Sequence, residues 1–190
     1  MANEDVSDAV LDAARVAFNS RGYARTTMKG VAAAAGVAPS VLRKYYENKE
    51  QMFAAAMKLP FDPSSAVPEL ISPGLDGMGE RMVRGTFEVL KDDESREQIF
   101  ELFAAGASAG RAAQSVRDFL EEAIVDRIAT VVGIPDARMR ASLISSHLIG
   151  LAATRYVIQL EPLASAPEDD VVRIYAPIIQ DLLDPTKPVY

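Results

Sequence analysis

Few side chains in this sequence are suited to catalysis or metal binding. The 190 residues include one histidine, His147, and no cysteine, which excludes disulfides, thiolate zinc sites, iron–sulfur clusters and cysteine nucleophiles. Residues 106–110 (GASAG) match the letters of a G-x-S-x-G nucleophile elbow, but that motif requires a strand before the serine. A helical pattern precedes Ser108, so we interpret the segment as a turn between helices. With no glycine-rich phosphate loop either, we expect neither an enzyme nor a cofactor or metal site.

Charged side chains suggest a different chemistry, the binding of a polyanion. The formal net charge is −7, yet residues 20–58 carry seven Lys and Arg against two Glu. Residues 59–190 carry 12 Lys and Arg against 21 Asp and Glu. A short basic module on an acidic body suggests that only the module meets a polyanion. Random scatter of surface charge is the alternative.

The elements that must position these charges are helices. Apolar residues recur every four positions from Ser7 to Ser20, which predicts a helix with Ser7 as its N-cap and Gly22 after its end. Three shorter helices follow. Their expected spans are Thr27 to Ala35, Pro39 to about Tyr46, and Lys49 to Lys58.

Residues 28–45 have the spacing of a helix-turn-helix. Ala32 is small enough for two helices to cross, Gly36 suits a left-handed turn, and Leu42 can seat the second helix. The preceding amphipathic helix and the Thr26-Thr27 cap strengthen this interpretation.

Beyond residue 58 the chain is expected to form a second, larger domain. Four prolines in residues 60–75 indicate a boundary, because they cannot continue the preceding helix. Five further helices are predicted, at about 76–91, 95–108, 111–132, 136–161 and 168–184, and Pro177 should kink or split the last one. We therefore predict an all-α protein of about nine helices. Its expected parts are a three-helix helix-turn-helix DNA-binding domain at 1–58, a proline-rich linker at 59–75 and a larger helical domain at 76–190.

The first 55 residues, roughly, resemble the tetracycline-repressor (TetR) family of bacterial transcriptional regulators. The likeness is carried by Ala13-Ala14, Phe18, Gly22-Tyr23, Thr26-Thr27, Val31-Ala32, Ala35-Gly36-Val37, Leu42, Tyr45-Tyr46 and Asn48-Lys49-Glu50. The resemblance implies that Thr27, Tyr45 and Lys49 hold DNA phosphates. It also implies that Pro39, Ser40, Arg43 and Lys44 face the major groove. The sequence departs from the family pattern at Ala38, where Ser or Thr is usual, and at Arg43, where an aromatic residue is common.

The resemblance also implies that the second domain senses a ligand and forms a homodimer. Residues 143–160 are apolar on nearly every side, and with helix 168–184 they would form a four-helix bundle across a two-fold axis. A core within one chain is the alternative.

Candidate ligand contacts lie among the helices of this domain. The aromatic residues Phe87, Phe100, Phe103 and Phe119 could line an apolar pocket, with His147 and Arg155 as polar anchors. The structural alternative pairs Arg155 with Glu101, Glu121 or Glu122 and makes His147 a satisfied core residue.

These inferences predict a DNA-binding regulator, a repressor that a small-molecule ligand releases from a palindromic operator. The alternative is a helical ligand-binding or interaction protein that has lost DNA binding. No apolar stretch reaches the roughly 18–20 uncharged residues of a membrane span, and the acidic N-terminus lacks the basic region of a signal peptide. The absence of cysteine fits a cytoplasmic protein, and the expected partners are double-stranded DNA, a second copy and a small molecule.

Overall fold

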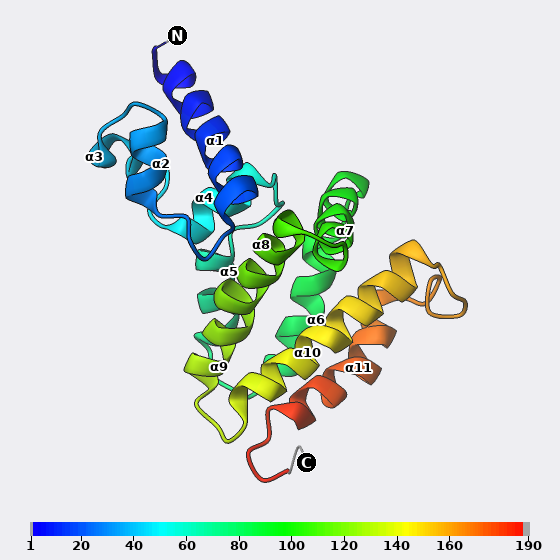
Figure 1. The fold of residues 1–190 in the computed structure, drawn as a ribbon. Coiled ribbons are helices and arrows are strands. Elements are labelled where there is room, and N and C mark those ends of the chain that lie inside the picture. Colours follow the sequence, from blue (N-terminus) through cyan, green and yellow to red (C-terminus); the bar gives the residue numbers. More distant parts are fainter. Residues whose placement is uncertain (1, 188–190) are drawn as a thin grey trace. The chain divides into compact units, whose positions relative to one another are not determined.

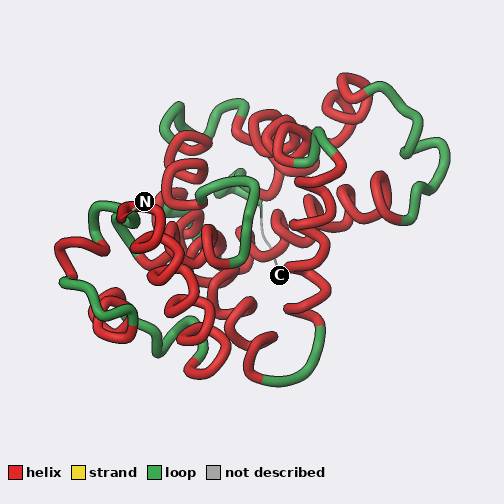
Figure 2. The backbone as a smooth tube through the Cα atoms, turned by 90° about the horizontal axis from the view of Figure 1, so that it is seen from above, coloured by secondary structure: helices red, strands yellow, loops and turns green. Residues whose placement is uncertain are grey.

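A computed structural model describes residues 2–187, and within that range the chain is helical with no strand (Figures 1 and 2). It divides into two compact units. Unit 1 comprises the chain up to Ser64 together with Gln98–Ala123, and unit 2 comprises Ser65–Glu97 together with the chain from Ile124 onward. This division differs from the expected one at 58 and 76, since residues 98–123 pack with the N-terminal helices.

Four helices open unit 1. They are α1 (Ala2–Arg21), α2 (Met28–Ala34), α3 (Pro39–Leu42) and α4 (Lys49–Ala56). Helix α1 ends before Gly22, which has a φ of 85° and donates its N–H to the carbonyl of Phe18 at 3.0 Å. The predicted N-cap at Ser7 is wrong, because no glycine or proline stops the helix from beginning earlier.

An aromatic cluster forms the core of unit 1. The ring of Phe53 lies 4.8 Å from Phe18, 5.1 Å from Tyr23 and 4.3 Å from Phe119. All four side chains are fully buried. Phe119 lies on α8 (Arg111–Leu120), and Arg111 donates to the carbonyl of Ser20 near the end of α1. These contacts explain why residues 98–123 belong to unit 1.

The proline-rich segment contains a helix where a linker was expected. Helix α5 spans Pro63–Ile71. Pro63 occupies its first turn, where the missing N–H costs no hydrogen bond. Val67 and Ile71 are buried, so tertiary packing outweighs the helix-breaking tendency of Pro68. With α5 included, the described residues form ten continuous helical runs rather than about nine.

Unit 2 packs its helices around one apolar core. They are α6 (Met78–Val89), the start of α7 (Asp93–Ala107), α9 (Asp126–Val132), α10 (Ala137–Ala152) and α11 (Glu168–Leu182). The core includes Met82, Val83, Ile128, Ile144 and Ile179. Helix α11 runs through Pro177 without a break, so of the two expected outcomes, a kink or a split, the split does not occur. Pro177 is exposed, so water can reach the carbonyl that the proline leaves without its helical partner.

Two π-helical turns interrupt the long helices. The turn η1 (Glu121–Val125) joins α8 to α9 in one continuous run, as expected for 111–132. The turn η2 (Ala153–Val157) ends the run that begins with α10, a few residues before the expected end at 161. None of the described helices is both long and apolar enough to cross a membrane.

Candidate nucleic-acid interface

The predicted helix-turn-helix is confirmed between α2 and α3. Gly36 adopts a φ of 69°, and the N–H of Val37 donates to the carbonyl of Ala32 at 3.0 Å. Ala32 and Leu42 are fully buried and hold the two helices together. A residue with a β-carbon would be strained at Gly36, so this turn depends on glycine.

Thr27 begins α2 as its N-cap, as predicted. Its Oγ1 accepts a hydrogen bond from the N–H of Gly30 at 3.1 Å, and the residue is exposed. The hydroxyl can still donate its own hydrogen to an acceptor such as a phosphate oxygen.

Helix α3 is shorter than expected. It ends at Leu42, and residues 43–45 continue as turns in which Lys44 and Tyr45 donate to the carbonyls of Val41 and Leu42, both at 3.0 Å. These i to i+3 bonds tighten the chain relative to an α-helix. Ala38 contributes no side-chain cap at the start of the helix.

The residues predicted to face the major groove lie on the surface of this segment. Pro39, Ser40, Arg43 and Lys44 are exposed, while Tyr45 is half-buried. Tyr46 is buried, and burial raises its pKa above the usual value, which agrees with a packing role.

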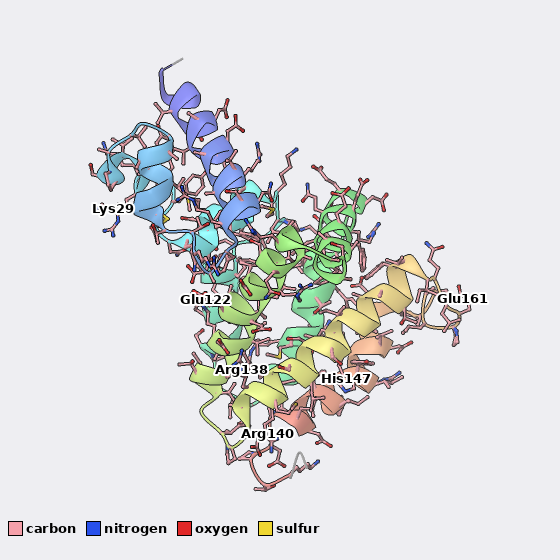
Figure 3. The ribbon with its side chains drawn as sticks, in the orientation of Figure 1. Lys29, Glu122, Arg138, Arg140, His147 and Glu161 are labelled. Atoms are coloured by element: carbon pink, nitrogen blue, oxygen red, sulfur yellow. The ribbon has the colours of Figure 1, made fainter. Side chains whose placement is uncertain are left out.

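Lys49 is the first residue of α4, after the N-cap Asn48, whose Oδ1 accepts from the N–H of Gln51 at 2.7 Å. The Nζ atom of Lys49 lies 3.2 Å and 3.3 Å from the two carboxylate oxygens of Glu122. It also lies 4.0 Å from the centre of the Tyr23 ring. Figure 3 labels Glu122 on η1, in the helical run that begins at Arg111. No sequence signal links Lys49 to Glu122, because 73 residues separate them.

In unit 2, Arg155 has backbone carbonyls as partners rather than a glutamate. Its Nη1 donates to Leu163 O at 2.6 Å and its Nη2 to Ala166 O at 2.8 Å. The expectation of an ion pair with Glu101, Glu121 or Glu122 is therefore wrong. The chain after η2 folds back and presents carbonyl oxygens to the end of the helix, where a cation is also favoured by the helix dipole.

Phe87 and Arg155 are brought together within unit 2. The guanidinium carbon of Arg155 lies 5.4 Å from the centre of the Phe87 ring. Phe87 also lines a surface groove of about 370 Å³. His147 lies elsewhere on α10, with its Nδ1 3.3 Å from the hydroxyl oxygen of Tyr175. Burial raises the pKa of Tyr175.

The other predicted pocket residues belong to unit 1. Phe100 and Phe103 are half-buried on α7, with ring centres 6.2 Å apart. Phe119 is fully buried in the aromatic cluster with Tyr23 and Phe53. The set of ligand contacts remains a prediction.

The serine of the G-x-S-x-G letters does not lie after a strand. Ser108 falls in the turn between α7 and α8, as expected, and its Oγ donates to the carbonyl of Ala105 at 2.7 Å. A nucleophile elbow is not formed here.

Comparison with known proteins gives matches over both parts of the chain. Residues 10–56 match a family model described as "Bacterial regulatory proteins, tetR family". Residues 76–183 match one described as "Tetracyclin repressor-like, C-terminal domain". No curated protein sequence matches the chain.

Solved structures match nearly the whole chain. A TetR-family regulator from Streptomyces coelicolor is 34% identical, with 95% of each chain covered and a TM-score of 0.47. NalD, the secondary repressor of the MexAB-OprM multidrug efflux pump in Pseudomonas aeruginosa, is 14% identical, with 94% of this chain and 95% of that chain covered and a TM-score of 0.50. FadR, a fatty acid degradation regulator from Bacillus halodurans, is 18% identical, with 95% and 100% covered and a TM-score of 0.50. The likeness to NalD and FadR concerns the fold alone.

Proposed function

The chain belongs to the TetR family, whose members are DNA-binding repressors with ligand-binding C-terminal domains, and we propose that it represses transcription as a homodimer on a palindromic operator. The observation that carries this proposal is the helix-turn-helix, with exposed Ser40, Arg43 and Lys44 on and after α3.

Two kinds of DNA contact are assigned to this module. Thr27, Tyr45 and Lys49 bind backbone phosphates and fix the position of the module on the duplex. Pro39, Ser40, Arg43 and Lys44 face the major groove. Arg43 is the residue best suited to read a guanine there, because a guanidinium can donate to two acceptors on that base.

Homodimerisation is assigned to α10, η2 and α11. Apolar side chains on these elements are exposed within the single chain, which is costly in water unless a partner covers them. They include Ile149, Val157, Ile158, Ile174 and Ile178. With a two-fold axis here, the two recognition segments would read half-sites about 34–36 Å apart, one helical turn.

Release is assigned to a small molecule that binds the helices of the C-terminal domain. Phe87, Phe100, Phe103, Phe119, His147 and Arg155 remain its candidate contacts. A surface groove lies beside Phe87, and its other walls are mainly charged, with Arg84, Glu88, Lys91 and Glu168.

Selection of bound duplexes from a random pool tests the proposal. We expect an inverted repeat to be enriched, and its affinity to fall steeply as salt concentration rises, because phosphate binding releases counterions. A chain that enriches no sequence and binds no mixed duplex at low salt would support the alternative, a helical interaction protein without DNA binding.

A further inference from the structure

Lys49 forms an ion pair with a carboxylate of its own chain, that of Glu122. The two distances from Nζ, 3.2 Å and 3.3 Å, join it to both carboxylate oxygens of Glu122. The side chain of Lys49 is 19% exposed and that of Glu122 is 49% exposed. A partly buried ion pair is screened less by salt than one in open solvent.

Buried aromatic rings hold both partners in place. The ammonium of Lys49 lies over the ring of Tyr23, which packs in the cluster of unit 1. Phe119 of the same cluster precedes Glu122 by three residues in the run that α8 and η1 form. The packing of Phe119 against Tyr23 therefore keeps the backbone of this segment close to the ring over which Lys49 lies.

The pair has a consequence for any anion that approaches the start of α4. With Glu122 in contact, the charge of Lys49 is already compensated. A phosphate that reaches this lysine also meets a half-exposed carboxylate of the same sign, which repels it. A phosphate at this position therefore has to share the ammonium donors with Glu122 or displace it.

We propose that Glu122 competes with a DNA phosphate for Lys49, and thereby sets the affinity of the DNA-binding module. The inference rests on the phosphate contact assigned to Lys49 under the proposed function. Glu122 belongs to η1, the π-helical turn in which the chain passes from unit 1 to unit 2. A change in the winding of that turn would move the carboxylate that competes with the phosphate for Lys49.

The test measures binding of the full chain to a mixed-sequence duplex of about 30 base pairs, by fluorescence anisotropy over a series of KCl concentrations. Glu122→Gln keeps the size of the side chain and removes its charge. We expect it to tighten binding by about three- to tenfold at low salt. The gain should shrink as salt rises, because salt screens the repulsion. Glu122→Ala should give the same gain, and thermal unfolding checks that both variants fold.

Two controls separate competition from a general change in charge. Glu121→Gln makes the same change one residue earlier on the helix, and we expect a smaller gain from it. In a Lys49→Met background, Glu122→Gln should give no gain, because the lysine for which Glu122 and the phosphate compete is gone. The inference is overturned if Glu122→Gln binds no more tightly than the original chain, gains no more than Glu121→Gln, or gains as much without Lys49.

A separate measurement tests the phosphate contact that we assign to Lys49. Lys49→Met alone should weaken binding and flatten the dependence on salt. If it leaves binding unchanged while the chain still binds DNA, the phosphate contact is wrong, and the competition falls with it. If Lys49→Met weakens binding but Glu122→Gln has no effect, only the competition is wrong.

Discussion

At the scale of single residues, Lys49 forms an ion pair with the carboxylate of Glu122, and Arg155 donates hydrogen bonds to two backbone carbonyls. Thr27, Asn48 and Gly36 were predictable, because a cap or a left-handed turn involves residues within a few positions of one another. The partners of Lys49 and Arg155 were not. Glu122, one of the three glutamates considered as partners of Arg155, contacts Lys49 instead. Arg155 donates to the carbonyls of Leu163 and Ala166, which reach it because the chain turns back after η2.

Arg43 carries the first prediction at this scale. It is exposed just after the last residue of α3, where family members commonly have an aromatic residue. If it reads a guanine, Arg43→Ala should change preference at one base position by about 1–3 kcal/mol and leave the others as they were. Binding to a set of single-base variants of the selected operator measures this. An equal loss of affinity for every variant would make Arg43 a phosphate contact.

At the scale of elements, periodicity and caps predicted most helices, and tertiary packing decided the exceptions. Helix α5 forms although it contains two prolines, since Val67 and Ile71 are buried. Helix α11 continues through Pro177 because that residue is on the solvent side. Both outcomes depend on which neighbours cover a face, and composition alone does not contain that information.

The contact of α6 with α11 carries the second prediction. A β-carbon on Gly79 would lie 2.4 Å from the backbone oxygen of Ala176 and 2.7 Å from the backbone nitrogen of Gln180. Neither atom can move without shifting α11, so Gly79→Ala should lower the free energy of unfolding by about 3 kcal/mol. Chemical denaturation of the full chain measures this loss.

Gly85 offers a matched control on the same helix. A β-carbon there would meet only Leu70 Cδ1 at 3.5 Å, an ordinary contact. Gly85→Ala should therefore be neutral or stabilise the protein by up to about 1 kcal/mol, because alanine favours the helix. Equal losses at both positions would contradict the close approach of α6 and α11.

At the scale of the whole molecule, the exposed apolar face of α11 carries the third prediction. Ile174 is 66% exposed, and in the proposed homodimer its side chain is covered by the partner. Ile174→Glu would bury a charge without a counterion, so we expect a monomer in sedimentation experiments and weaker binding to a palindromic operator. Val16→Glu changes a side chain that is 67% exposed on α1 and should remain a dimer. A dimeric Ile174→Glu variant would place the interface elsewhere.

The last prediction concerns the coupling between ligand and operator. A ligand can shift the protein between its DNA-binding and released states only by binding the two states with different affinity. By linkage, the operator must then weaken ligand binding by the same factor by which the ligand weakens operator binding. A ligand found by thermal-shift screening should show this reciprocity when its affinity is measured with and without operator. An anionic ligand should lose affinity in Arg155→Met, and a neutral polar one in His147→Ala. Equal affinities with and without operator would mean that the compound is no inducer, whichever helices it contacts.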